Sequence, residues 1–254
     1  MRAVLMYHSI DDSGSAISVS PAVFAAQVHW LARSGMRIVP LDALLDLDPA
    51  DDRDAIALTF DDGFANFNAA ASLLEEHGMP ATVFIVTGHV GRTNAWGGHA
   101  HRGIPTLPLL DWPGLERLAA RGFAIGAHTH VHAPLTTLTG SAAGEEMDRC
   151  TAELAARLGI EPSSLAYPYG DVDDDIAALA MGRFPLAVTT RFAALTTDQP
   201  RAWIPRLDMY YFRRPGAIRR LARDGFEFWM QWVRWRRSAR GTVAPGRAPV
   251  GTGR

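Results

Sequence analysis

Short apolar runs alternate along the chain with segments whose apolar residues recur at helical spacing. The apolar runs predict seven strands, at residues 3–7, 37–39, 55–60, 81–86, 123–127, 164–167 and 186–189. The segments between them predict five helices, at residues 21–34, 65–77, 112–121, 141–158 and 173–181. Ser20 followed by Pro21 is a typical helix start, and Gly78 and Gly159 each follow a predicted helix end.

This alternation of strands and helices predicts a parallel sheet covered by helices. With about seven strands, we expect the sheet to close into a (β/α) barrel, and a doubly wound open sheet is the alternative. In both folds the functional groups lie at the carboxyl ends of the strands. His8, Asp61, His128 and Tyr169 each follow a predicted strand, and they are therefore the first candidates for a site.

Three segments lie outside the alternation. Residues 89–108 are rich in Gly, His and Pro and predict a long loop over the site. Residues 215–237 predict one long amphipathic helix, and the low apolar content of residues 241–254 predicts a disordered tail beginning at residue 238. We therefore expect one folded domain over residues 1–237.

Composition narrows the class of protein. Of the 254 residues 48% are hydrophobic, which suits a single domain with a large core, and a net charge of only -2 gives no nucleic-acid signature. The single Cys150 excludes an internal disulfide and, within a helical pattern, predicts a buried thiol. Neither a signal-peptide pattern nor a run of about 20 apolar residues is present, so we expect a cytoplasmic location.

Two clusters of residues could carry chemistry. Asp61 and Asp62 are adjacent at a predicted strand end before Gly63, where two carboxylates can take different roles. His128 and His132 are four residues apart, so both rings can reach one metal ion, whereas His130 should point elsewhere, close behind the site or into solvent. One Asp and two His would leave coordination positions open for water.

These clusters resemble the first two motifs of the polysaccharide deacetylases, the NodB-homology family of carbohydrate esterases. The first is Thr59-Phe60-Asp61-Asp62-Gly63, the second is His128-Thr129-x-x-His132, and the third resembles Leu165-Ala166-Tyr167-Pro168-Tyr169-Gly170. The resemblance spans residues 7–211 in the right order. It implies a distorted (β/α) barrel that removes acetyl groups from sugar polymers with a divalent metal.

The resemblance also implies a role for individual residues. Asp62, His128 and His132 would bind the metal, and Asp61 would act as general base. The Tyr169 backbone N–H would stabilise the oxyanion, while its ring would line the sugar groove.

The chain departs from the family pattern twice. Where the third motif normally has an Arg that holds the base, this chain has Ala166, and Arg206 is either its substitute or an ordinary surface residue. The family's late general-acid His is also missing, since no His follows His132. His8, after Tyr7, resembles the Tyr-His motif of a branch that includes biofilm poly-N-acetylglucosamine deacetylases, in which the strand order is circularly permuted. We predict that His8 is the general acid; a structural His at a strand end is the alternative.

Aromatic and basic residues suggest further contacts. Trp96, Trp112, Tyr169 and Tyr210 are candidates for sugar stacking, although most aromatic residues in such a chain belong to the core. From residue 213 onward there are eleven Arg and only two acidic residues. The helix at 215–237 therefore either docks on anionic lipid or, more simply, closes the barrel with Arg at its exposed edge.

The predicted function is metal-dependent removal of N-acetyl groups from a polysaccharide or oligosaccharide. One carboxylate and two imidazoles suit Zn²⁺, although Co²⁺ or Ni²⁺ could be accepted. The alternatives are a deformylase or another hydrolase of non-peptide C–N bonds, and a carbohydrate-binding relative without turnover.

Overall fold

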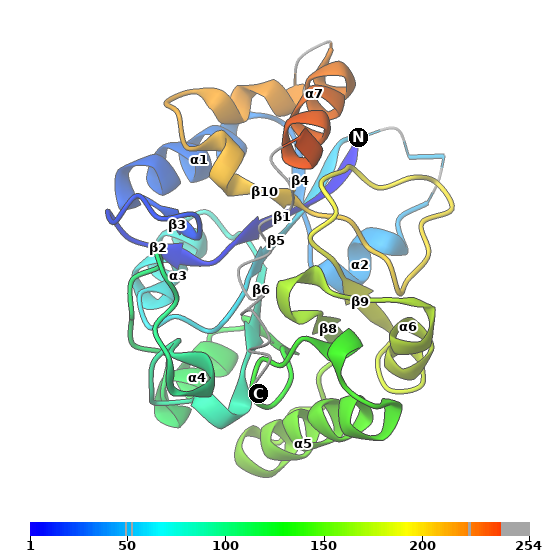
Figure 1. Ribbon diagram of the computed structural model, residues 1–254. Coiled ribbons are helices and arrows are strands. Elements are labelled where there is room, and N and C mark those ends of the chain that lie inside the picture. Colours follow the sequence, from blue (N-terminus) through cyan, green and yellow to red (C-terminus); the bar gives the residue numbers. More distant parts are fainter. Residues whose placement is uncertain (49, 52, 223–224, 240–254) are drawn as a thin grey trace.

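An eight-stranded parallel sheet, curled into a distorted (β/α) barrel, lies at the centre of the molecule (Figure 1). The computed structural model describes residues 1–48, 50–51, 53–222 and 225–239. The strands of this sheet are β1 (Arg2–Tyr7), β4 (Arg37–Ile38), β5 (Ala55–Phe60), β6 (Ala81–Ile85), β7 (Ala124–Ala127), β8 (Ser164–Ala166), β9 (Leu186–Val188) and β10 (Leu207–Asp208). Their order is β10-β1-β5-β6-β7-β8-β9, and β4 pairs with the start of β5. A small separate sheet pairs β2 (Ser9–Ile10) with β3 (Ser18–Val19).

Residues 204–208 connect the two edges of the large sheet. At one end Ile204 pairs with Val188 at the end of β9, and at the other Leu207 pairs with Leu5 of β1. Arg206 lies between these two contacts. The segment that closes the barrel thus carries one of the candidate site residues.

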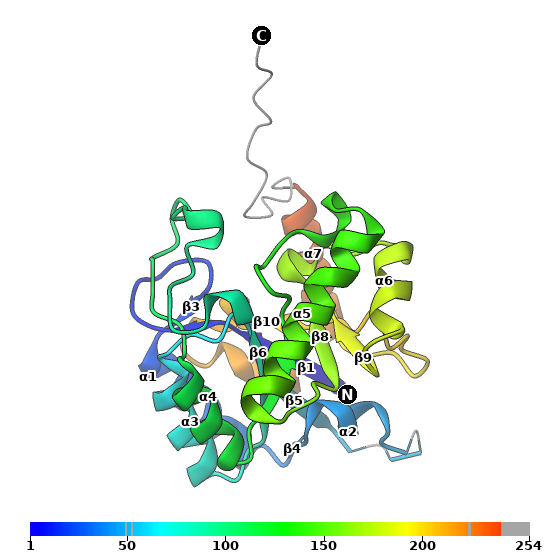
Figure 2. The same ribbon diagram turned by 90° about the horizontal axis from the view of Figure 1, so that it is seen from below.

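Helices surround the sheet. They are α1 (Pro21–Arg33), α2 (Leu41–Leu45), α3 (Phe67–Glu76), α4 (Trp112–Ala120), α5 (Gly140–Leu158), α6 (Asp174–Met181) and α7 (Phe226–Ala239). All of these α-helices except α2 pack on the outer side of the sheet. Short 3-10 helices are η1 (Thr87–His89), η2 (Trp96–Gly98), η3 (Leu135–Thr137), η4 (Pro168–Gly170), η5 (Met209–Phe212) and η6 (Ala217–Ala222). Figure 2 shows α5 between α4 and α6 across the outside of the strands. No helix within the described ranges is long and apolar enough to cross a membrane.

The strands separate two hydrophobic cores because side chains alternate between the faces of a sheet. On β1, Ala3, Leu5 and Tyr7 point outward into the large core under the helices, whereas Val4 points into the barrel. The barrel interior is narrow and filled mainly by small or branched side chains: Val4, Ala55, Ala57, Phe84, Ala166, Leu186, Val188 and Ile204, together with Leu41 and Leu44 of α2. Asp61 continues the inward series of Ala55 and Ala57, so its carboxylate is directed to the top of this interior.

The predicted (β/α) barrel is confirmed, and all seven predicted strands are present to within two residues. The short strands β2, β3 and β10 and the helix α2 were not predicted. The predicted single helix at 215–237 is wrong: η6 and α7 are separate, and Gly225 between them has a φ of 84°, which an α-helix cannot continue. The predicted tail was to begin at residue 238, but Ser238 and Ala239 still belong to α7, and residues 240–254 lie outside the described residues.

Candidate active site

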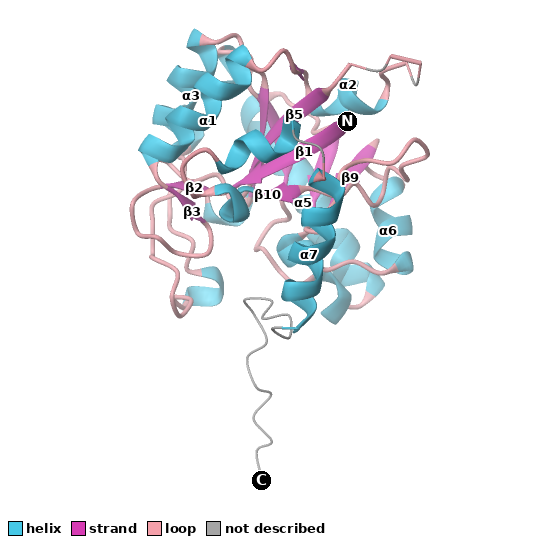
Figure 3. Cartoon of the chain, turned by 90° about the horizontal axis from the view of Figure 1, so that it is seen from above, coloured by secondary structure: helices cyan, strands magenta, loops and turns pink. Residues whose placement is uncertain are grey.

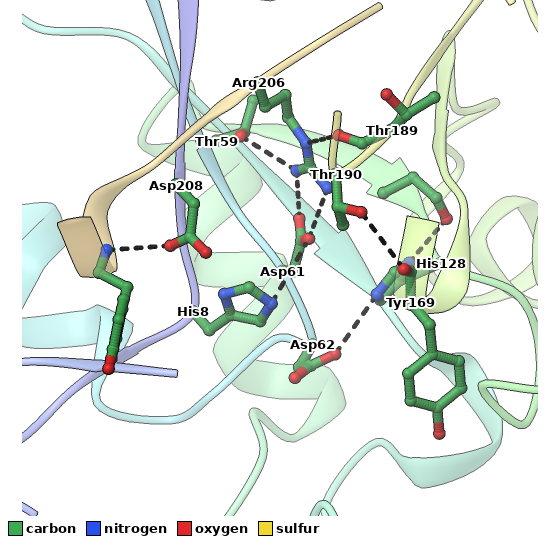
Figure 4. Close-up of polar contacts among 12 residues, drawn as sticks. His8, Thr59, Asp61, Asp62, His128, Tyr169, Thr189, Thr190, Arg206 and Asp208 are labelled. Carbon is green, nitrogen blue, oxygen red and sulfur yellow. Dashed lines mark hydrogen bonds and ion pairs between the residues drawn. The ribbon is translucent and has the colours of Figure 1, made fainter. Parts of the chain in front are cut away.

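The carboxyl ends of β1, β5, β7 and β8 bring together most of the candidate residues (Figure 4). His8 follows β1, Asp61 and Asp62 follow β5, and His128 follows β7. Arg206 enters from the closing segment between β9 and β10. Residues far apart in the chain thus meet at one rim of the barrel, as the fold requires.

Asp61 and Arg206 form a buried, bidentate ion pair. Nη1 and Nη2 of Arg206 each donate to one oxygen of Asp61 at 2.7 Å, and both side chains are almost fully buried. Arg206 Nε donates to the Thr189 carbonyl at 2.9 Å and Nη1 to Thr59 Oγ1 at 3.2 Å, so four hydrogen bonds hold the guanidinium. Arg206 is therefore not a surface residue, and it fixes the orientation of Asp61.

The surroundings of Asp61 keep it ionised. Burial alone would raise the pKa of its carboxyl, but the charge and hydrogen bonds of Arg206 hold that pKa below its usual value. His8 adds to this effect from Nε2, which lies 3.8 Å from Asp61 Oδ2. His8 is partly exposed, with 20% of its side chain accessible, so it faces both Asp61 and the open rim.

Asp62, His128 and His132 form a second group, which we call the metal group. Nε2 of each histidine lies 3.3 Å from Asp62 Oδ1, and one ligand atom from each residue lies within 4.8 Å of the others. Asp62 Oδ1 is buried without a hydrogen-bond partner among the described residues. A buried, unpaired carboxylate oxygen facing two imidazole nitrogens fits a divalent cation.

The protonation states of Asp62 and His132 also favour metal binding. Burial lowers the pKa of His132 to about 4, so its ring is neutral near pH 7 and can act as a ligand. Burial would raise the pKa of Asp62, but the two imidazoles hold it well below its usual range. One carboxylate and a neutral imidazole are what a zinc-type site requires.

The carbonyl of Ala166 orients His128. It accepts a hydrogen bond from His128 Nδ1 at 2.7 Å, which leaves Nε2 directed at Asp62. The side chain of Ala166 points into the barrel core beside Phe84. The guanidinium of Arg206 lies 5.8 Å from the ring of the same Phe84.

Unusual backbone conformation is concentrated here. Within the described residues, the non-glycine residues with positive φ are Asp62 (70°), Thr129 (64°), His132 (61°) and Tyr169 (61°). Two are members of the metal group, one lies between its histidines, and one is the candidate oxyanion residue. Such left-handed residues cost energy and persist where the surrounding structure enforces them, typically at functional sites.

Two aromatic residues flank His132. The Trp96 ring stacks on it at 4.5 Å with an angle of 20°, and the Tyr169 ring meets it edge-on at 4.5 Å. Trp96 belongs to the predicted loop at 89–108, whose base is fixed by Asn94 through hydrogen bonds with Leu107 and Pro105. In the turn at Tyr169 the N–H groups of Gly170 and Asp171 donate to the carbonyls of Tyr167 and Pro168, so the Tyr169 N–H is not used by this turn.

Other candidates lie elsewhere. Trp112 packs on the large core with its ring facing Arg157 at 5.8 Å, and Tyr210 lies under the guanidinium of Arg213 at 3.9 Å. His130 is buried rather than exposed, and its Nδ1 lies 3.1 Å from Thr87 Oγ1. His130 is thus not part of the metal group, as predicted, whereas sugar stacking by Trp112 and Tyr210 stays a prediction.

Sequence reasoning missed the residues that support the site. Thr59 and Thr189 help to hold Arg206, and the Ala166 carbonyl orients His128. Thr59 could have been found, because it is a polar residue in the inward series formed by Ala55, Ala57 and Asp61. Backbone carbonyls carry no sequence signal.

Comparison with known proteins finds a matching family and similar proteins. The polysaccharide deacetylase family model matches residues 48–182. YxkH of Bacillus subtilis, named after this family, is 28% identical over 201 residues, covering 77% of this chain and 67% of that protein. A poly-beta-1,6-N-acetyl-D-glucosamine N-deacetylase of Staphylococcus epidermidis is 25% identical, covering 75% of this chain and 67% of its own length.

A solved structure has the same fold. The polysaccharide deacetylase BC0361 from Bacillus cereus superimposes with a TM-score of 0.68 at 25% identity, covering 82% of this chain and 64% of that one. This chain therefore spans about two thirds of the length of these relatives. The family match begins at residue 48 and ends at residue 182, so His8 and Arg206 lie outside it.

Proposed function

Because the chain belongs to the polysaccharide deacetylase family, we propose that it hydrolyses N-acetyl groups of an amino-sugar polymer or oligomer with a bound divalent metal. The observation that carries this proposal is the pairing of two buried centres at one rim. Asp62, His128 and His132 could hold the metal, and Asp61 is held beside them by Arg206. Binding alone would not need a buried, ionised carboxylate next to a metal site.

Zn²⁺ is the metal that we propose for this site. One carboxylate and two imidazoles form a mixed O,N set with positions left for water, which suits Zn²⁺, and Co²⁺ or Ni²⁺ could replace it. When bound, such an ion lowers the pKa of water and polarises a carbonyl.

Residues of the chain itself are proposed to act as general base and as oxyanion donor. Asp61 accepts the proton of the attacking water at a carboxylate oxygen, because Arg206 keeps it ionised and fixes its direction. The Tyr169 N–H, which the local turn leaves unused, donates to the oxyanion that forms at the acetyl carbonyl oxygen when water attacks its carbon.

His8 is proposed to be the general acid. An amide anion is too basic to leave, so the sugar nitrogen must receive a proton as the C–N bond breaks. His8 Nε2 lies 3.8 Å from Asp61 at the open rim, where it can donate a proton to that nitrogen. This assignment replaces a late histidine that the chain does not have.

The substrate class that we propose is an N-acetylglucosamine polymer or its oligomers. Relatives are named as deacetylases of poly-beta-1,6-N-acetyl-D-glucosamine and of chitin. Trp96 and Tyr169 stand beside His132, so a sugar ring at the metal group would lie against aromatic surface.

The test is acetate release from β-1,6- and β-1,4-linked N-acetylglucosamine oligomers by Zn²⁺-loaded protein, with N-formyl oligomers in parallel. We expect acetate from one linkage, its loss in Asp61→Asn, and unchanged metal content in that variant. Release of formate but not acetate would indicate a deformylase. No product from any oligomer, with metal bound, would indicate a binding protein and overturn the proposal.

A further inference from the structure

Helix α7 exposes an aromatic stripe on the outside of the molecule. The stripe consists of Phe228, Trp232 and Trp235, with 76%, 46% and 66% of each residue exposed. Spacings of four and three residues put them on one side of the helix. Figures 1 and 3 show α7 at the periphery, outside the sheet.

The stripe is not the side of α7 that holds the helix to the protein. Phe226, Met230 and Val233 are at most 8% exposed and pack into the large core. Trp229 joins this inner side through contacts with Phe192 and Phe212. The helix is therefore apolar on both sides, and core packing accounts for only one of them.

Arginine residues lie on and beside α7. The Arg236 guanidinium lies 4.7 Å from the Trp232 ring of the stripe, and the Arg220 guanidinium of the adjoining η6 lies 5.2 Å from the Trp229 ring. Arg219 and Arg220 are both exposed on η6. Between residues 209 and 239 the sequence has only two acidic residues, at positions 224 and 227. Exposed Trp and Phe next to Arg are the combination that binds the interface of anionic bilayers.

We propose that this stripe docks the protein on an anionic lipid surface. A symmetric dimer through the same surface is disfavoured, because a two-fold axis would bring the Arg residues of both copies together. Trp and Phe would enter the headgroup region while Arg contacts lipid phosphates. This inference does not depend on the catalytic proposal.

The test is co-sedimentation of the full chain with phosphatidylcholine vesicles, with and without phosphatidylglycerol, at low and high salt. We expect binding only with phosphatidylglycerol at low salt, and at least tenfold weaker binding for Trp232→Ser/Trp235→Ser. Arg219→Gln/Arg236→Gln should bind about fivefold more weakly for each charge removed. Arg121→Gln/Arg183→Gln removes the same charge from elsewhere and should bind normally.

Two further measurements distinguish lipid docking from catalysis and from dimerisation. Deacetylation of soluble oligomers should be unchanged in the α7 variants, so a failure of docking is distinct from a failure of catalysis. No binding of the intact chain to anionic vesicles at low salt would overturn the inference. A concentration-dependent dimer that disappears in Trp232→Ser/Trp235→Ser would overturn it as well, because the stripe would then be a protein interface.

Discussion

Replacing Arg206 with Met should destabilise the protein strongly, because it leaves the Asp61 carboxylate buried without its partner. The guanidinium is fully buried and makes two 2.7 Å bonds to Asp61. Removing one member of a buried ion pair costs about 3–5 kcal/mol. For a chain of this size we expect the melting temperature to fall by roughly 6–20 °C.

The chain contains a matched control for this experiment. Arg183 and Asp148 form the same bidentate contact, at 2.7 and 2.9 Å, but their side chains are 29% and 60% exposed. Arg183→Met should cost only about 0–1 kcal/mol, because solvent screens an exposed pair. The two variants therefore differ in burial rather than in chemistry.

Both variants are to be unfolded in urea with EDTA present, since a bound metal would add its own stabilisation. The double variant Asp61→Asn/Arg206→Met should be more stable than Arg206→Met alone, because the uncompensated charge is gone. If Arg206→Met costs no more than Arg183→Met, the argument from burial is refuted.

Three further predictions concern the site and the core. His8→Ala should lower acetate release about 100-fold or more with unchanged metal content, measured by steady-state assay and elemental analysis, and full activity would exclude it as the acid. Cys150, whose thiol pKa burial raises to about 12, should resist Ellman's reagent in the folded protein and react after unfolding; rapid reaction when folded would contradict its burial. Gly126→Ala should cost about 1–3 kcal/mol in urea unfolding, because its Cβ would lie 2.4 Å from the Phe84 ring, and an unchanged midpoint would show that Phe84 can move.

The elements that the sequence predicts well are those whose own side chains decide their burial. β5 is buried on both faces, so residues 55–60 form an apolar run, interrupted only by Thr59, that is visible without a structure. β10 could not be found in this way, because it is only two residues long and exists through pairing with β1 across the barrel seam. The break before α7 could have been predicted from Gly225, because glycine often ends a helix. The prediction of one helix relied on the spacing of apolar residues alone.

In the candidate site, too, some residues could be predicted from their local sequence and others depend on contacts between distant segments. Strand-end position and motif spacing brought Asp61, Asp62, His128 and His132 to attention, and the structure brings them together. Which residue pairs with Asp61 depends on the closing of the barrel, since Arg206 is 145 positions away. From the sequence alone, Arg206 could therefore be either the partner of Asp61 or an ordinary surface residue.

The most direct test of the central claim is a titration of metal-free protein with Zn²⁺ in which bound metal and acetate release are measured on the same samples. The account predicts no acetate from metal-free protein, saturation of both signals at about one Zn²⁺ per chain, and loss of both in His128→Ala/His132→Ala. Full acetate release without metal, or tight binding of Zn²⁺ by that double variant, would contradict the assignment of Asp62, His128 and His132 as the metal group.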